Sequence, residues 1–324
     1  MRAIPAKENL TICFAHVAYR MTERFALRAT GIRHFQVSTL NDLTARLGEF
    51  DVLSVSMMWR NEFIARAPRL AFIQSISAGT DQYARDALTA AGIRLASAQG
   101  VNSEAVAQHA MALILALQRQ LHLARDNQVR RHWRGMISDM SQREDELAGK
   151  TLLIVGLGHI GSRLATLARA FGMRTIATKR DASTGAGAAD AAFSQDRLHD
   201  LLPKADVVAL TCPLTPDTER LIGAQALAAM KPSAILVNVA RGRVVDEPAL
   251  VEALAGKRIA AAGIDCTVDE PLPAASPLWA LDNALITPHT AGETRRYEDN
   301  VIDLLLENLE RIWRGETLLR NHIV

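Results

Sequence analysis

The sequence predicts an α/β protein that contains two doubly wound parallel sheets. Short apolar runs alternate with stretches of helical periodicity along most of the 324 residues, as strands and crossover helices do in such folds. The run 151–155 is too short for a helix and is rich in branched residues, which is typical of a strand buried on both faces. Two longer amphipathic stretches, 102–121 and 294–314, separate the two sets of strands and are expected to connect the domains.

The N-terminal region is expected to form the first of these domains. Its strands are predicted at 11–15, 33–37, 51–56, 71–75 and 93–97, and its helices at 18–29, 42–48, 61–67 and 82–91. The second region is expected to contain at least six strands, predicted at 151–155, 174–178, 206–211, 234–239, 261–266 and 284–287. Helices are expected between them, including 223–230 and 246–255, and the second of these begins with Asp246 as a cap followed by Pro248.

The composition excludes several classes of protein. A net charge of +2, with 37 basic and 35 acidic residues, creates no field that would favour nucleic acid or a membrane surface. The N-terminus lacks the apolar core of a signal peptide, and the longest apolar run, 110–117, is shorter than the roughly 20 residues needed to span a bilayer. A cytoplasmic protein is therefore expected. Cys13, Cys212 and Cys266 lack metal or disulfide spacing, so no metal is expected and the three are predicted to be small buried residues.

A glycine-rich segment, GLGHIG over 156–161, follows the strand at 151–155 and precedes a helical stretch. In this context Gly156 permits a tight turn, Gly158 lets the backbone approach a pyrophosphate, and Gly161 lets the helix pack closely on the strand. The diphosphate of a dinucleotide would bind at the free N–H groups of the helix N-terminus. The alternative is a glycine-rich turn that only reverses the chain.

The next strand, 174–178, ends at Lys179 and Arg180 rather than at the carboxylate that usually accepts the ribose hydroxyl of NAD. Two cations there can form charge-assisted hydrogen bonds with a 2′-phosphate, each worth roughly 1.5–3 kcal/mol. NADP(H) is therefore favoured as the cofactor over NAD(H), which is the second choice. The alternative is that both cations are solvated and that Asp181 accepts the ribose.

Two loops of the first domain follow strands at the carboxyl edge of its sheet, where ligands bind in such folds. The loop 77–81, with the sequence SAGTD, could present backbone N–H groups to a small carboxylate, or could be a plain turn with Asp81 as a helix cap. The loop 57–60 carries Trp59 and Arg60, which could line a substrate pocket or be a surface aromatic and a solvated cation.

Three polar residues stand at the carboxyl ends of strands in the second domain. Arg241 follows the strand at 234–239, Glu270 lies a few residues past the strand at 261–266, and His289 follows the last predicted strand. Strand ends of a parallel sheet meet at one edge, which also holds the glycine turn, so all three side chains can face a nicotinamide. Taken alone, each has a plain alternative as a surface arginine, a capping glutamate or a loop histidine.

Hydride transfer to a 2-oxo acid needs a cation to orient the carboxylate and polarise the carbonyl, and an acid to protonate the alkoxide. Arg241 fits the first role through its planar fork, and His289 fits the second. Glu270 beside the imidazole would favour its charged form and fix its tautomer. As a set, these residues are much less easily explained by the plain alternatives than each residue alone.

The connection between the two domains carries further residues of interest. The charged segment 125–146 contains Trp133 and is expected to be either an arm at a subunit contact or a solvated linker. His109 and His122, on or near the helix that precedes it, are expected to be packing or surface histidines rather than ligands.

These segments resemble the D-isomer-specific 2-hydroxyacid dehydrogenases over nearly the whole chain. The matching segments are SAGTD from Ser77, VNSEAVAQHAMALILAL from Val101, ELAGKTLLIVGLGHIG from Glu146, CPLTPDT from Cys212, VNVARGRVVDEPAL from Val237, GIDCTVDEP from Gly263 and TPHTAG from Thr287. The resemblance implies a Rossmann coenzyme domain, 101–290, inserted into a flavodoxin-like substrate-binding domain made of 1–100 and 291–324. It also implies a homodimer.

By the same resemblance Arg241, Glu270 and His289 would be catalytic, and backbone groups at Ala78 and Gly79 would hold the substrate carboxylate. Asp265 would contact the nicotinamide carboxamide. The implied activity is reduction of a small 2-oxo acid, such as glyoxylate or hydroxypyruvate, with NAD(P)H. Cofactor contacts are implied at Gly156, Gly158, His159, Ile160, Gly161, Lys179, Arg180, Cys212, Pro213, Thr218, Val239, Ala240, Asp265 and His289.

Three residues depart from the usual pattern of this family: Gln108 where a Glu is common, Thr211 where a His is common, and Lys179 where NAD-type members carry Asp. Formate dehydrogenases of this fold carry Gln at the position of Glu270, so that activity is disfavoured. Phosphoglycerate dehydrogenases usually carry extra regulatory sequence, and this chain is not expected to contain such a segment. The competing hypothesis is a non-catalytic, dinucleotide-sensing module like the corepressors that share this fold, against which the intact Arg, Glu and His argue.

Overall fold

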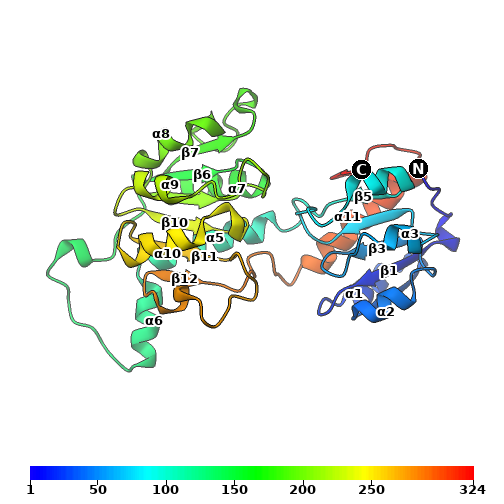
Figure 1. Ribbon diagram of the computed structural model, residues 1–324, viewed down its shortest axis with the longest axis horizontal. Helices are drawn as coiled ribbons and strands as arrows, with labels where there is room; N and C mark the ends of the chain where they lie inside the picture. Colours follow the sequence, from blue (N-terminus) through cyan, green and yellow to red (C-terminus); the bar gives the residue numbers. More distant parts are fainter. The chain divides into compact units, whose positions relative to one another are not determined.

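The computed structural model describes residues 1–324 and divides into two compact units. The outer unit contains Met1–Asn102 and Thr294–Val324, and the inner unit contains Ser103–Glu293. Both ends of the chain therefore belong to one unit, in which the blue and red segments of Figure 1 lie together.

The outer unit is built on a five-stranded parallel sheet with the strand order β2-β1-β3-β4-β5. One face packs against helices α1 (Met21–Ala26) and α11 (Tyr297–Trp313), and the other against α2 (Leu40–Ala45), α3 (Phe63–Arg66) and α4 (Arg85–Ala91). This order is the flavodoxin-like one that was expected. The strands are β1 (Thr11–Ala15), β2 (Arg33–Val37), β3 (Val52–Val55), β4 (Phe72–Ser75) and β5 (Arg94–Ala96), all within the predicted runs.

The inner unit is built on a seven-stranded parallel sheet with the order β12-β11-β10-β9-β6-β7-β8. The order reverses between β6 and β9, which gives the predicted Rossmann topology and makes the carboxyl ends of these two strands the place where a ligand binds. The strands are β6 (Thr151–Val155), β7 (Arg174–Lys179), β8 (Ala191–Ser194), β9 (Val207–Leu210), β10 (Ile235–Asn238), β11 (Ala261–Ile264) and β12 (Ala284–Ile286).

Strand β8 is absent from the predicted set. It is a half-buried edge strand that begins with Ala191 and Ala192 and pairs only with β7. Because alanine has low strand propensity, its apolar pattern is too weak to identify from the sequence.

The predicted helix 102–121 is broken near its C-terminal end. Helix α5 (Ser103–Gln118) stops before Gln120, which has a φ of 50° and therefore a left-handed conformation that a right-handed helix cannot include. Leu121 then begins a second helix, α6 (Leu121–Val129), and is 55% exposed rather than part of the buried stripe.

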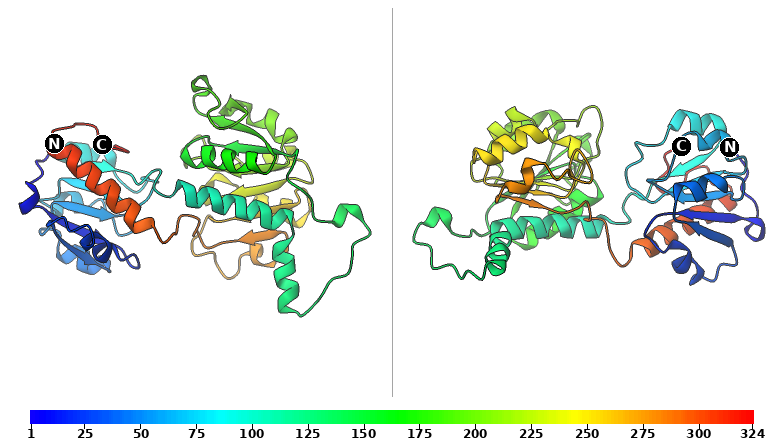
Figure 2. Two further views of the ribbon diagram at one scale, coloured as in Figure 1. Left: turned by 180° about the vertical axis from the view of Figure 1, so that it is seen from behind. Right: turned by 60° about the horizontal axis from the view of Figure 1, so that its bottom comes forward.

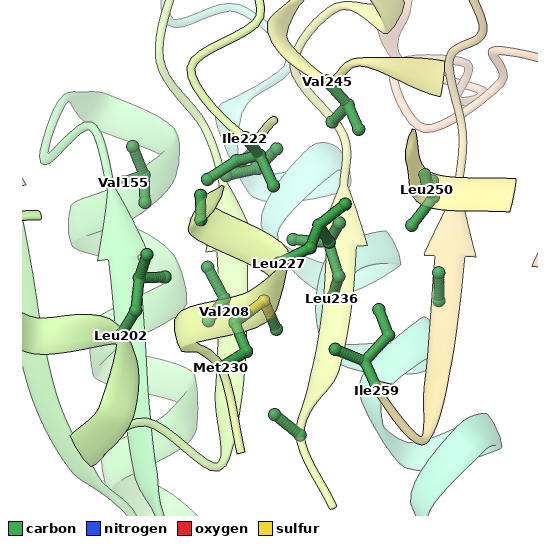
Figure 3. Close-up of a cluster of buried hydrophobic side chains, with 14 of the residues drawn as sticks. Val155, Leu202, Val208, Ile222, Leu227, Met230, Leu236, Val245, Leu250 and Ile259 are labelled. Atoms are coloured by element: carbon green, nitrogen blue, oxygen red, sulfur yellow. The ribbon is translucent and has the colours of Figure 1, made fainter. Parts of the chain in front are cut away.

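Helices cover both faces of the inner sheet (Figures 1 and 2). Helices α5 and α7 (His159–Ala170) pack together on one face, while α8 (Leu198–Leu201), α9 (Ala224–Ala229) and α10 (Glu247–Ala255) cover the other. Figure 3 shows the second core, where Leu227 of α9 and Leu250 of α10 lie over Val208 and Leu236 of the sheet. Asp246 caps α10 as predicted, accepting a hydrogen bond from the Ala249 N–H.

Beyond α6 the chain leaves the body of the inner unit as an extended arm, residues 130–139, which Figure 2 shows projecting away from the sheet. Trp133 is 97% exposed and Met136 fully exposed. No helix of the chain is both long enough and apolar enough to cross a membrane. All three cysteines are buried as predicted, and burial raises the pKa of the Cys212 thiol to about 11, so it stays protonated near neutral pH.

Candidate active site

The glycine segment forms the turn between β6 and α7, where the strand order reverses. Gly156 has a φ of 102°, a left-handed conformation that side chains rarely adopt, and a Cβ there would lie 2.7 Å from the backbone of Cys212 at the end of β9. A Cβ on Gly161 would lie 2.4 Å from the carbonyl oxygen of Gly156. A larger residue at either position would push the helix away from the sheet, so both glycines have the structural reasons that the sequence suggested.

Gly158 differs from these two glycines, because a Cβ there would meet no protein atom within 4 Å. It is the N-cap of α7, and no side chain caps this helix. The N–H groups of the first turn, which begins with His159 and Ile160, have no partner within the helix itself. The space that a Cβ would enter therefore lies at an open helix N-terminus, whose N–H groups and dipole suit a diphosphate. These residues fit the pyrophosphate of a dinucleotide.

Thr211 ties the two strands at the switch point together. Its Oγ1 donates a hydrogen bond to the carbonyl oxygen of Gly156 at 2.7 Å, and its N–H donates to Val155 at 2.9 Å. The residue that departs from the family pattern therefore holds the glycine turn in place. In the loop after Cys212, the Thr218 hydroxyl donates a hydrogen bond to the Pro213 carbonyl at 2.7 Å. This bond joins two residues of the same loop and stabilises its conformation.

Lys179 and Arg180 lie at the carboxyl end of β7, as predicted. Nζ of Lys179 donates to Thr184 Oγ1 at 2.6 Å, and Arg180 is exposed. Asp181 accepts hydrogen bonds from the N–H of Ser183 at 3.0 Å and from its hydroxyl at 2.5 Å, and these bonds lower the pKa of its carboxyl group. Because Asp181 caps this turn, its carboxylate already has donors, which weakens the alternative in which it accepts a ribose.

Arg241 sits in a turn after β10 that the side chain of Asn238 closes. Asn238 Oδ1 accepts from the Ala240 N–H at 3.0 Å, and its Nδ2 donates to the Arg241 carbonyl at 3.0 Å. The half-buried Arg241 guanidinium donates from Nη1 to the Ala240 carbonyl at 2.7 Å, and this is its single hydrogen bond. Its remaining N–H groups can bind a carboxylate in the planar fork geometry. Val239 and Ala240 are themselves buried, so they offer chiefly backbone to a ligand.

The turn that carries Arg241 presses against the loop that carries Glu270. A Cβ on Gly242 would lie 2.0 Å from the carbonyl carbon and oxygen of Thr267. The Val268 N–H also donates to Glu247 Oε2, at the start of α10, at 2.9 Å. Gly242 and Glu247 could not be identified from the sequence, because neither contact has a local signal: each joins two loops that are separate in the chain.

His289 and Glu270 form a direct pair. The His289 Nδ1 lies 2.9 Å from Glu270 Oε1 and 2.8 Å from Oε2, and the Thr267 N–H donates to Oε1 at 3.1 Å. The carboxylate accepts only, so Nδ1 carries a proton and Nε2 is the atom left for a substrate. Both side chains are partly open to solvent, at 44% and 40% exposure.

Asp265 directly follows strand β11 and is buried, at 2% exposure. Its Oδ1 accepts hydrogen bonds from the Thr287 hydroxyl at 2.7 Å and from the Thr290 N–H at 3.0 Å, while Oδ2 accepts only a longer one, 3.2 Å, from the Ala291 N–H. The carboxylate thus anchors the loop that carries His289, and Oδ2 retains capacity for a further donor. His109, which was expected to be a packing or surface residue, contacts this network through Nε2 at 2.9 Å from Thr287 Oγ1.

The outer unit contains the loop proposed for a carboxylate. Ala78 is exposed and Gly79 half-buried, after the end of β4. The Ala98 N–H donates to the Ser77 carbonyl at 3.0 Å, which holds the loop from below. Asp81 is not a helix cap: α4 begins at Arg85, and its cap residue forms no side-chain hydrogen bond.

Trp59 is buried at 3% exposure, so the alternative of a surface aromatic is wrong. Its ring packs edge-on against Phe63 at 5.8 Å, and its Nε1 donates to Asn61 at 2.9 Å. The ring belongs to the core of the outer unit, and a pocket-lining role for it has no support in this position. Arg60 is exposed, and its Nη1 donates to the carbonyls of Met57 and Trp59.

Comparisons with known proteins identify relatives of this chain. The chain is 36% identical over 295 residues to the glyoxylate reductase of Aeropyrum pernix, covering 87% of this chain and 85% of that protein. It is 35% identical over 296 residues to glyoxylate/hydroxypyruvate reductase B of Pectobacterium carotovorum, covering 90% and 92%. The crystal structure of the TT0316 protein from Thermus thermophilus superposes with a TM-score of 0.83 at 34% identity, covering 97% of this chain and 100% of that one.

The sequence profile of the NAD binding domain of D-isomer specific 2-hydroxyacid dehydrogenases matches residues 111–291. This range holds the glycine turn, Arg241, Glu270 and His289. The chain therefore belongs to the D-isomer specific 2-hydroxyacid dehydrogenase family and is a nicotinamide-dependent oxidoreductase of 2-hydroxy acids.

Proposed function

We propose that this chain reduces a small 2-oxo acid, such as glyoxylate or hydroxypyruvate, with NADPH to the 2-hydroxy acid, which has the D configuration where the product is chiral. The observation that carries the proposal is the His289–Glu270 pair at the same sheet edge as Arg241 and the Gly156 turn. Two relatives, which are 36% and 35% identical to this chain over the aligned residues, are named as reductases of glyoxylate. Their names support this substrate class.

The bound cofactor supplies the hydride. Arg241 orients the substrate carboxylate and polarises the carbonyl with the N–H groups that have no protein partner. His289 gives the proton on Nε2 to the developing alkoxide, and Glu270 holds Nδ1 so that the ring keeps this orientation. In the outer unit, the backbone N–H groups at Ala78 and Gly79 are proposed to bind a small carboxylate.

The test is the decrease in NADPH absorbance with a panel of 2-oxo acids that differ in chain length, with glyoxylate and hydroxypyruvate among them. We expect turnover of the small members, and a chiral assay of the product from hydroxypyruvate should show the D configuration. Tight NADPH binding without turnover of any member would instead support a dinucleotide-sensing module. The panel also orders substrates by kcat/KM, which measures how large a side chain the enzyme accepts.

Our proposal of NADPH rests on Lys179 and Arg180 at the end of β7. A 2′-phosphate carries close to two negative charges, and these cations stand where NAD-type members carry a carboxylate. The Lys179 Nζ donates a hydrogen bond to the hydroxyl oxygen of Thr184, which is exposed. Replacing this acceptor with a phosphate oxygen costs little free energy, because water can take the place of the lysine at Thr184.

Lys179→Asp should shift the NADP/NAD ratio of kcat/KM toward NAD by about 10- to 100-fold, because one charge-assisted hydrogen bond is lost and a like charge is added. Steady-state kinetics with both coenzymes measure the ratio. Arg174→Asp is the matched control, since Arg174 is exposed at the opposite end of the same strand and should leave the ratio unchanged. An unchanged ratio for the Lys179 variant would remove the phosphate-binding role.

We also propose that the arm, residues 130–139, contacts a second copy of this chain in a homodimer. Trp133 and Met136 in the arm, and Met140 directly after it, have exposed apolar side chains. Apolar side chains gathered in this way are typical of a subunit contact. Sedimentation equilibrium should give about twice the 35.3 kDa mass of one chain. Trp133→Ser combined with Met136→Ser should give the monomer mass, whereas Leu27→Ser, another exposed apolar residue, should not.

A further inference from the structure

We propose that His109, on helix α5, is a positioning residue that holds the loop of His289 through Thr287 and Asp265. This inference rests on the proposed function, because its consequence is the placement of the proton donor. His109 does not touch the substrate, so its effect is on the geometry of another side chain.

The directions of the hydrogen bonds identify His109 as the donor. The Thr287 hydroxyl has one proton, which it gives to Asp265 Oδ1 at 2.7 Å. The contact of 2.9 Å between His109 Nε2 and Thr287 Oγ1 therefore requires a proton on Nε2, with the hydroxyl oxygen accepting. This bond exists in both the neutral and the charged form of the ring. The chain of bonds runs from helix α5 through Thr287 to the buried carboxylate.

The loop needs such anchoring because His289 has a φ of 54°, a left-handed conformation that is strained for a residue other than glycine. Such a conformation persists only where the surroundings impose it. Here the Asp265 backbone carbonyl accepts from the His289 N–H at 2.7 Å, and its carboxylate accepts from residues on both sides of His289. His109 holds Thr287, two residues before His289, through the hydrogen bond to the threonine hydroxyl oxygen.

Helix α5 can serve as the anchor because it packs closely on the sheet. A Cβ on Gly263, in strand β11, would lie 3.0 Å from the Leu113 Cβ, so a side chain at this position would push Leu113 away by a few tenths of an ångström. Leu113 and His109 are four residues apart and share a face of the helix. The contact that places Leu113 on β11 therefore brings His109 to the carboxyl end of the same strand, where Asp265 begins the loop.

Burial makes this support necessary. Asp265 is 2% exposed, and the His109 Nε2 lies 3.5 Å from its Oδ1. A buried carboxylate is costly unless hydrogen-bond donors surround it. Removing the imidazole takes away the donor that holds Thr287, whose hydroxyl is one of the donors to this carboxylate, so the loop loses part of the network that anchors it.

The experiment compares His109→Leu with His109→Gln, whose amide keeps a donor for Thr287. The leucine variant should lose about 10- to 100-fold in kcat, because a catalytic group displaced by even 1 Å reacts much more slowly. Its affinity for NADPH, measured by fluorescence, should stay within about 3-fold of the original protein, since the Gly156 turn is not involved. The glutamine variant should recover most of kcat. His122→Leu is the control, because His122 contacts only the Ala116 carbonyl, at 3.4 Å.

A kcat of His109→Leu equal to the original, or a glutamine variant as slow as the leucine one, would overturn the proposal. If the leucine variant does not fold, Thr287→Val against Thr287→Ser makes the same comparison from the other side of the bond. Nuclear magnetic resonance of the His289 imidazole in His109→Leu provides a readout without turnover. A shifted signal supports the proposal and an unchanged one contradicts it, even if no 2-oxo acid is reduced and the proposed function itself fails.

Discussion

His289→Ala should lower kcat by about 10²–10⁴ with glyoxylate or the best substrate of the panel, the range expected when a general acid is removed. The imidazole is held at Nδ1 by both oxygens of Glu270, so Nε2 is presented in one orientation and no other side chain takes its place. NADPH affinity should change little, because His289 is only one of the implied cofactor contacts and those of the glycine turn lie in a different loop. The kinetic signature is therefore a fall in kcat with nearly constant coenzyme binding.

The control for this substitution is His199→Ala. His199 is exposed on α8 and forms no part of the sheet edge described above. Its replacement should leave kcat unchanged. A His289→Ala enzyme with undiminished kcat would exclude His289 from proton transfer and would leave the reaction without an assigned acid.

Gly242→Ala should lower kcat by about 10²-fold although the substitution adds only one methyl group. The added carbon would lie 2.0 Å from the Thr267 carbonyl and 2.5 Å from the Val268 N–H nitrogen, both backbone atoms, so one of the two loops must move. These loops carry Arg241 and Glu270, and a displacement near 1 Å is enough to cost about 10²-fold in rate. The melting temperature should also fall, since overpacking typically costs about 1–3 kcal/mol.

Gly48→Ala is the matched control, because a Cβ there would meet no atom within 4 Å and the residue does not have a positive φ. That variant should retain both activity and melting temperature. Kinetics, thermal melting and NADPH binding measured on the same preparations separate displaced catalytic loops from global unfolding. Normal kcat in a well-folded Gly242→Ala enzyme would show that the close contact between the two loops is unnecessary for catalysis.

Some features of the fold could not be predicted from the sequence, and the physical reason can be given for each. Strand β8 begins with two alanines at the sheet edge and has little apolar signal. The break at Gln120 depends on a single left-handed residue, which the periodicity on either side of it does not reveal. Trp59 could not be assigned to the core or the surface, because its burial depends on Phe63 and on the helices packed around it.

The sequence by itself determined the two parallel sheets, the glycine turn and the three polar residues at strand ends. It could do so because apolar runs buried on both faces have a local signature, and because the carboxyl ends of parallel strands converge whatever the loops do. Only the tertiary structure decided which loops touch. The approach of Gly242 to Thr267 and the hydrogen bond from His109 to Thr287 join residues far apart in the chain, and such contacts depend on how helices and loops pack rather than on any local pattern.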